Sequence, residues 1–419
     1  MSRSMLRANP KSTAWFVRLL TLGLAGFMAL SLVPHAYGGK KKKAQPSEAE
    51  AATVAPEPVI DTTKLVWPGP PDIARIRWLQ QFKGERVTEP VQPVKKKQHW
   101  MDRLAGVKQV DEIRIVLPHV LVEPYGVAVD SKDKIYVADT YVGAIFIFNA
   151  ESDKVEFIHN GKEVHFEQII GLAIDDDDRL FVSDSHLRTV FVFDPAHRLV
   201  GSFGQESLER PSGIALDTRN RFLYVADVAK DHIAVFDADS FKLLRTIGGP
   251  PAKVGDEDAG TFARPTNVAV DASGNVYVAD TLNDRIQIFD ADGNFINMFG
   301  RAGDGPGAFG RPKGLAIDRD GHIWVADTSM DRVQVFDREG RLAGFFGMHG
   351  TLPGQFILPT GIAIDKRNRV LVSEQFKGRV QVFRYITDAE AAAAKADHEK
   401  NAPITSSQQP SPAGTELKP

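Results

Sequence analysis

The sequence contains no cysteine. Its absence excludes disulfide bonds, thiolate metal sites, cysteine nucleophiles, covalent c-type haem and a lipid-modified N-terminal cysteine. Neither sign of charge is in large excess, because 51 basic and 54 acidic residues leave a net charge of −3. A general nucleic-acid-binding protein needs a strongly basic face, so we expect no nucleic acid among the partners.

The first 38 residues lack acidic side chains and read as a targeting segment. Basic side chains precede a largely apolar run over residues 19–33, Pro34 ends the run, and residues 36–38 offer a cleavage site. The order is that of an export signal. The run is shorter than the about 20 residues of a membrane span. We predict a cleaved signal peptide over residues 1–38, with an uncleaved inner-membrane tether through residues 19–33 as the alternative. Either places the protein in the periplasm or another extracytoplasmic compartment.

Polar, low-complexity segments flank the centre of the chain. Residues 39–72 are predicted to be a disordered linker and residues 388–419 a disordered tail, in which the alanine run of residues 388–400 could form a short helix. A short helix is also plausible over residues 99–107. It would either cap one end of a channel or lie on the surface as a linker.

The centre of the chain repeats itself six times. Each repeat opens with a segment like Gly-Val-Ala-Val-Asp, at residues 126–130, 171–175, 213–217, 267–271, 314–318 and 361–365. A segment like Ile-Tyr-Val-Ala-Asp follows, at residues 135–139, 180–184, 223–227, 276–280, 323–327 and 370–374. A third apolar run comes next in every repeat and a fourth in five of them. Short β-branched and aromatic runs between Asp, Gly and Asn turns are typical of strands.

Four strands in every repeat predict an all-β fold, a six-bladed β-propeller. Helical repeats of similar length would show a 3.6-residue periodicity, which this sequence lacks. The innermost strands of a propeller crowd around its axis, so one position in each must stay small. An alanine fills that position in every repeat: Ala128, Ala173, Ala215, Ala269, Ala316 and Ala363.

The sixth repeat has no fourth strand of its own, and an unpaired sheet edge invites aggregation. The pattern of residues 76–84, ahead of the first repeat, matches the fourth strands elsewhere. We therefore predict that residues 73–84 complete the last blade and close the ring. The propeller would then span residues 73–387, with its repeats at about 124–386.

Repeats four to six carry the fullest pattern, Pro-x-Gly-φ-Ala-φ-Asp, then φ-aromatic-Val-Ala-Asp, then Arg-φ-Gln-φ-Phe, where φ is apolar. It is best kept within residues 265–289, 312–336 and 359–383. This pattern resembles the NHL repeat. The resemblance implies a binding platform of the bacterial envelope, although some eukaryotic relatives bind RNA and a few relatives are metal-dependent lyases or lactone hydrolases. Repeats one to three depart from it, with Ala144, Thr189 and His232 at the position of the arginine.

An acidic residue ends the second strand of every repeat: Asp139, Asp184, Asp227, Asp280, Asp327 and Glu374. Symmetry predicts that the six form a ring. The ring would either hold a cation, or each carboxylate would accept hydrogen bonds from nearby backbone N–H groups or pair with the following arginine. A feature that recurs in every blade usually serves the blade, so we interpret the ring as structural.

Binding residues are better sought where the symmetry breaks. The residue at the entry of each innermost strand, which follows a proline in five repeats, varies along the chain, and Asn267 replaces a glycine. These positions should surround one channel mouth, where propellers bind ligands. The candidate binding residues are Tyr125, Thr266, Asn267 and Lys313. Ordinary variation at solvated loop ends is the alternative.

The sequence has no Gly-x-Ser-x-Gly and no His-x-Glu-x-x-His motif, so we expect no catalytic residue, no metal and no other cofactor. The hypothesis that follows is an exported, non-enzymatic scaffold that presents a channel mouth and loops to a protein or polymer of the envelope. The alternative is a metal-dependent hydrolase or lyase that acts on a small molecule at the mouth.

Overall fold

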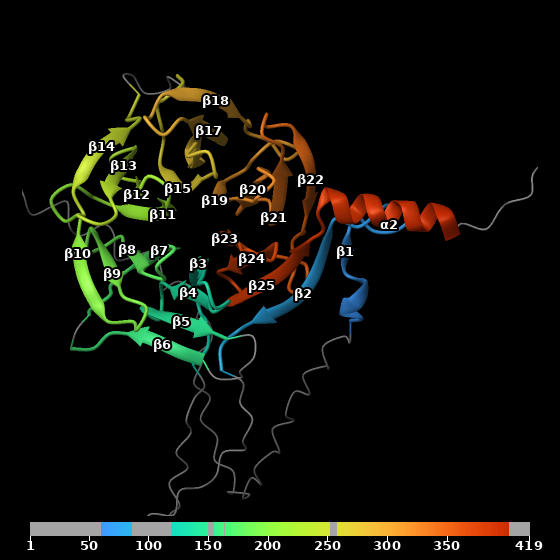
Figure 1. Ribbon diagram of the computed structural model, residues 1–419, viewed down its shortest axis with the longest axis horizontal. Coiled ribbons are helices and arrows are strands. Elements are labelled where there is room, and N and C mark those ends of the chain that lie inside the picture. Colours follow the sequence, from blue (N-terminus) through green and yellow to red (C-terminus); the bar gives the residue numbers. More distant parts are fainter. Residues whose placement is uncertain (1–59, 86–118, 150–154, 163, 252–257, 402–419) are drawn as a thin grey trace, which may run out of the picture. The chain divides into compact units, whose positions relative to one another are not determined.

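The computed structural model describes residues 60–85, 119–149, 155–162, 164–251 and 258–401. The targeting segment at residues 1–38 and the expected helix at residues 99–107 lie outside them. Within the described residues, the strands form six antiparallel sheets arranged as blades around an axis (Figure 1). The prediction of an all-β, six-bladed β-propeller is confirmed.

The first five blades run outward from the axis in chain order, and the sixth does so as far as its third strand. The innermost strands are β3 (Pro124–Val129), β7 (Ile169–Ile174), β11 (Pro211–Asp217), β15 (Pro265–Val270), β19 (Pro312–Ile317) and β23 (Pro359–Ile364). The second strands are β4 (Ile135–Asp139), β8 (Leu180–Asp184), β12 (Phe222–Asp227), β16 (Val276–Asp280), β20 (Ile323–Asp327) and β24 (Arg369–Glu374). The third strands are β5 (Ala144–Phe148), β9 (Thr189–Phe193), β13 (His232–Asp237), β17 (Arg285–Phe289), β21 (Arg332–Phe336) and β25 (Arg379–Tyr385). The outermost strands of the first five blades are β6 (Val155–His159), β10 (Leu199–Phe203), β14 (Leu243–Ile247), β18 (Phe295–Phe299) and β22 (Leu342–Phe346). A 3-10 turn, η2 (Thr281–Asn283), follows β16.

The aspartate at the end of each innermost strand shapes the turn that follows. Asp130 Oδ1 accepts hydrogen bonds from the backbone N–H groups of Lys132 and Lys134, at 2.9 and 2.8 Å. Within this turn Asp133 has a φ of 65°, in the left-handed region that aspartate, asparagine and glycine tolerate best. Gly274 takes the corresponding place in blade four, with a φ of 90°. The repeated aspartate therefore sets the hairpin between the first two strands.

The conserved spacing of alanines places each one opposite a large side chain on the second strand. Ala128 pairs with Tyr136, and Ala316 pairs with Trp324. The small side chain leaves room for the ring, as the crowding argument requires. The Trp324 indole N–H then donates to Asp318 Oδ2, at 2.9 Å, so the ring is also held to the strand-end aspartate.

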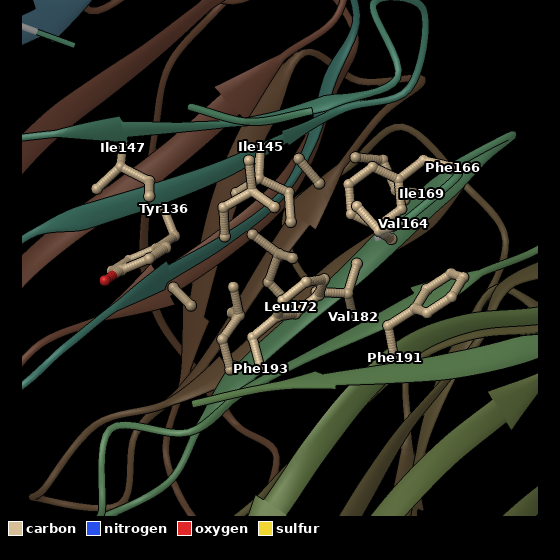
Figure 2. Close-up of a cluster of buried hydrophobic side chains, with 14 residues drawn as sticks. Tyr136, Ile145, Ile147, Val164, Phe166, Ile169, Leu172, Val182, Phe191 and Phe193 are labelled. Atoms are coloured by element: carbon tan, nitrogen blue, oxygen red, sulfur yellow. The ribbon is translucent and has the colours of Figure 1, made fainter. Parts of the chain in front are cut away.

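Apolar side chains fill the space between neighbouring blades. Between blades one and two, Tyr136 and Ile145 pack with Leu172, Val182 and Phe193 (Figure 2). Six such clusters bridge the six neighbouring pairs of blades. The core is therefore a ring of interfaces rather than a single centre.

Hydroxyl groups tie neighbouring blades together near the axis. Ser373 Oγ of blade six donates to the carbonyl oxygen of Tyr125 in blade one, at 2.5 Å, and accepts from the Gly361 N–H, at 2.9 Å. Thr328 Oγ1 of blade five donates to the Pro359 carbonyl of blade six, at 2.7 Å. The first and last repeats are thereby joined at the innermost layer.

Strand β2 (Ile76–Phe82) closes the ring at the rim. It pairs with β25 in antiparallel register, with Ile76 opposite Tyr385 and Phe82 opposite Val380. In Figure 1 this N-terminal strand lies alongside the C-terminal strand of the last blade. The prediction that an N-terminal strand completes blade six is confirmed.

The linker expected at residues 39–72 is ordered at its end. Within it lie a 3-10 turn, η1 (Thr62–Lys64), and strand β1 (Val66–Trp67), which adds a fifth strand to the last blade. The reason is an aromatic contact, because the Trp67 ring lies 5.9 Å from the rings of both Phe346 and Phe383. The prediction of disorder is therefore wrong for residues 60–72, the part of the linker that the structure describes.

The tail expected at residues 388–419 also begins with order, because Asp388–Asn401 form helix α2. Its alanine run favours a helix, and Thr387 and Glu390 form a capping box. Glu390 Oε2 accepts from the Thr387 N–H, at 2.8 Å, and Thr387 Oγ1 accepts from the Glu390 N–H, at 3.3 Å. None of the helices in the described ranges has the length and apolarity needed to span a membrane.

Deleting residues 39–84 should destabilise the propeller strongly. The deletion removes every β2–β25 hydrogen bond and uncovers the cluster that buries Ile76 and Trp67. Loss of several kcal/mol of apolar burial corresponds to a fall in melting temperature of about 10 °C or more in a domain of this size. Calorimetry or circular dichroism measures it. A chain truncated only at residues 402–419 is the control, and equal melting of the two truncated chains would contradict the closing role.

Candidate binding site at the channel mouth

The entries of the innermost strands and the turns after the second strands lie at one edge of the ring. Pro124, which begins β3, pairs with Asp139, which ends β4, and Pro312 pairs with Asp327 in the same way. We call this edge the mouth edge. All four candidate binding residues lie at it, and the ring of acids lies directly behind.

The acids of the ring are fully buried and bind backbone rather than solvent. Asp139 Oδ2 accepts from the N–H groups of Val122 and Glu123, at 2.6 and 3.1 Å, ahead of the first strand. Its Oδ1 accepts from the N–H groups of Tyr141 and Val142, at 3.1 and 2.9 Å, in the turn after the second. One carboxylate thus fastens two loops of its blade to each other.

Blades four and six add an arginine to this arrangement. Asp280 Oδ2 accepts from Arg285 Nε, at 2.8 Å, while its Oδ1 accepts from the Ala263 N–H, at 2.7 Å. Glu374 forms a buried ion pair with Arg379 and accepts from the Ile357 N–H, at 2.9 Å. These contacts favour the structural interpretation of the ring. Within the described residues, no group of three or more His, Asp or Glu side chains is arranged to hold a metal ion.

Tyr125 and Lys313 meet at the mouth although they come from blades one and five. Lys313 Nζ lies 5.6 Å from the centre of the Tyr125 ring, within the range of a cation–π contact. Burial raises the pKa of Tyr125 to about 12. Burial and the nearby Arg311 guanidinium lower the pKa of Lys313. Thr360 of blade six lies between them in the repeat and is only 1 % exposed.

Thr266 and Asn267 belong to blade four and are held by local contacts. Thr266 Oγ1 lies 2.6 Å from Thr281 Oγ1, and Asn267 Oδ1 accepts from the Val268 N–H, at 2.8 Å. The Asn267 side chain also fills space beside Gly213, where an added Cβ would lie 2.4 Å from Asn267 Oδ1. The Asn267 side chain therefore packs between blades three and four. Less of its amide group is available to a ligand than its position in the sequence suggests.

The channel behind the mouth is a cavity of about 190 Å³ lined by innermost strands of all six blades. Glycine, alanine, valine, leucine and isoleucine make most of its wall, and its polar side chains are those of Tyr125, Thr266 and Asn267. Lys313 stands outside the cavity, against Tyr125. The lining offers few groups for acid–base chemistry and suits the channel to a structural role.

Two exposed aromatic residues at the mouth edge escaped the sequence analysis. Tyr141 is 73 % exposed and Phe376 is 68 % exposed, each in the turn that follows a second strand. The equivalent turn positions in blades two and five carry His186 and Ser329. Blades three and four carry Ala229 and Leu282 there, so a Tyr or Phe ring found in blades one and six alone was the signal that could have found them.

Replacing Asp139 by asparagine should destabilise the fold. The amide presents N–H groups to backbone N–H donors and loses the charge that strengthens four hydrogen bonds, at a cost of about 3 kcal/mol in the free energy of unfolding. Asp227→Asn should cost a similar amount, because its carboxylate accepts from four equivalent N–H groups. Urea unfolding measures both, with the exposed Asp176→Asn as control. Wild-type stability of Asp139→Asn would disprove the fastening role.

Family models match three stretches of the chain. The NHL repeat matches residues 121–148 and 309–336, in blades one and five. The SMP-30/Gluconolactonase/LRE-like region matches residues 202–306, from the end of blade two through blade four. Each match falls on strands and turns of the propeller.

Relatives among curated proteins are similar over short segments. Probable peptidyl-alpha-hydroxyglycine alpha-amidating lyase pgal-1 of Caenorhabditis elegans is 32 % identical over 106 residues, which cover 25 % of this chain and 29 % of the lyase. Protein brain tumor of Drosophila melanogaster is 52 % identical over 44 residues, which cover 10 % of this chain and 4 % of that protein. The matched segments thus span less than a third of either relative.

Among solved structures, a structural genomics protein of unknown function from Bacteroides thetaiotaomicron superposes with a TM-score of 0.52. It is 18 % identical, and the match covers 63 % of this chain and 70 % of that one. Such a likeness speaks for the fold alone. The chain is thus a six-bladed β-propeller in which blades one and five match the NHL repeat.

Proposed function

We propose that the protein is an exported, non-enzymatic scaffold whose mouth edge binds a protein partner of the cell envelope. The observation that carries the proposal is the exposure of Tyr141 and Phe376, large rings that a soluble surface has no need to present. Aromatic side chains are enriched where proteins bind one another.

The exposed rings belong to segments that lie against each other. A Cβ added to Gly378, two residues after Phe376, would lie 2.1 Å from the Leu121 carbonyl oxygen and 3.2 Å from Val122 Cα. Val122 is itself 38 % exposed, and its N–H shares the Asp139 carboxylate with Tyr141. Blades six and one thus present neighbouring apolar side chains on a backbone that hydrogen bonds hold rigid. Rigid presentation lowers the entropy lost on binding.

The position of the protein in the cell is part of the proposal. A signal over residues 1–38 would export the chain, and an uncleaved residue 19–33 segment would tether it to the inner membrane. The ring would then face the envelope, where a protein partner, or a polymer in its place, is within reach.

A second candidate function, a metal-dependent lyase or hydrolase, follows from the resemblance to the Caenorhabditis elegans lyase. That resemblance covers a quarter of the chain. Metal analysis of the purified protein, together with turnover of small-molecule substrates, separates this candidate from the scaffold.

Crosslinking in intact cells tests the scaffold. A C-terminally tagged chain should capture one dominant envelope protein, and Tyr141→Ser with Phe376→Ser should reduce capture at least about tenfold, as for central interface residues. Tyr125→Ala with Lys313→Ala should reduce it as well. Phe345→Ser is the matched control, because Phe345 is 48 % exposed on an outermost strand away from the mouth.

Two results would contradict the proposed binding by the mouth edge. Unchanged capture by the mouth variants would move the binding surface elsewhere. Failure to capture any protein, with a bound metal in the purified chain, would favour the enzyme instead. The tagged chain's mass on the same gel decides between a cleaved signal and a tether.

A further inference from the structure

A second cavity lies between blades five and six, away from the mouth. It measures about 300 Å³, at the lower end of the range for small-molecule pockets. The start of β2, the β19–β20 turn, strands β20 to β22, the end of β25 and the start of α2 surround it. The turn follows the last residue of β19, whereas the mouth edge lies at its first, so the two sites are at opposite edges of the ring.

The walls of this cavity are apolar and well fixed. Ile76, Trp324, Val335 and Tyr385 are each at most 6 % exposed. The rings of Trp324 and Tyr385 meet edge to face, with centres 5.3 Å apart. An aromatic or aliphatic group that entered would meet preformed apolar surface.

One end of the cavity carries a histidine held by an aspartate. His322 Nδ1 lies 2.9 Å from Asp318 Oδ2, and the His322 backbone N–H donates to Asp318 Oδ1, at 2.8 Å. The bond to Asp318 raises the pKa of His322. In the part of the chain that the structure describes, His322 Nε2 has no hydrogen-bond partner. The ring is therefore oriented with one nitrogen free.

Other blades use the position of His322 differently. Arg179 in blade two and Arg369 in blade six bind their own strand-end aspartate and also reach a carboxylate of the next blade, Asp239 at 2.8 Å and Asp133 at 3.2 Å. These arginines link neighbouring blades through ion pairs. The His322 imidazole is too short to reach a carboxylate of the next blade. Blade five has the cavity where blades two and six have this contact.

An arginine stands at the same end. Arg75 forms an ion pair with Asp388, whose side chain is 73 % exposed. Its buried Nε has no hydrogen-bond partner among the described residues. Arg75 is close enough to His322 to oppose its protonation. The cavity thus combines apolar walls with two donors whose remaining hydrogen-bonding capacity suits an anion.

We propose that this cavity binds a small carboxylic acid with an aromatic or aliphatic tail. Its carboxylate would accept from Arg75 and from His322 Nε2–H, and its tail would lie against Trp324 and Tyr385. Guanidinium and imidazolium donors match a carboxylate, and the tail gains from leaving water. Asp388, being exposed, can yield its place on Arg75 at little cost.

Calorimetric titration of the full chain with 3-phenylpropionate and with hexanoate tests the site. At least one acid should bind, and its uncharged amide should bind at least tenfold more weakly. His322→Asn should weaken binding of the acid at least tenfold while the fold persists, because Asn275 at the same position in blade four bonds its aspartate through Nδ2, at 2.9 Å. His349→Asn is the matched control, because the His349 side chain is 74 % exposed and does not line the cavity.

A pocket-filling variant makes the test independent of charge. A Cβ added to Gly344 would meet no atom within 4 Å, and Gly344 shares a strand face with the buried Phe346. Gly344→Val should therefore fold, as melting curves will show, and abolish binding of the acid. Equal binding of acid and amide, wild-type binding by Gly344→Val or His322→Asn, or no binding of either acid at millimolar concentration would each overturn the proposal.

Discussion

Each blade of the propeller depends on a carboxylate buried at the end of its second strand. In blade one the charge of Asp139 is compensated by four backbone N–H groups and, among the residues that the structure describes, by no cation. A buried charge is tolerable only when it is satisfied in this way. The interaction also explains why the position is acidic in every repeat, since a neutral side chain could not bind donors from both loops. Blades four and six show the same solution with an arginine added.

The mouth edge inherits its rigidity from these carboxylates. They lie one layer behind the surface and, as Asp139 does in blade one, hold the loop ahead of the first strand and the turn that carries Tyr141. The strands of neighbouring blades are joined underneath by hydroxyl bonds such as that from Ser373 to Tyr125. A surface supported in this way rearranges little, which suits the scaffold that we propose better than a site that must close around a substrate.

The repeats made the blades and the closing strand predictable, because the alternation of apolar and turn residues is local and occurs six times. Strand β1 was not predictable, since its two residues are ordered by contacts of Trp67 with rings far along the chain. The same holds for the meeting of Tyr125 with Lys313, which spans an intervening blade. Asn267 marked a broken symmetry, but only the structure shows that its side chain wedges against Gly213. The cavity at His322 is lined by residues from both ends of the domain and from the β19–β20 turn, so no local sequence pattern predicts it.

The pairing of β2 with β25 gives the chain an order of assembly. Trp78 hydrogen-bonds to Gln381, 303 residues later, so the closing strand is synthesised first and finds its partner last. Until β25 has been synthesised, five blades can form by contacts between neighbouring blades, while strand β2 has no sheet to join. Contacts between residues so far apart in the sequence slow folding. The unpaired edge of β2 can meanwhile pair with strands of other chains. The emergence of β25 is then the event that completes the ring.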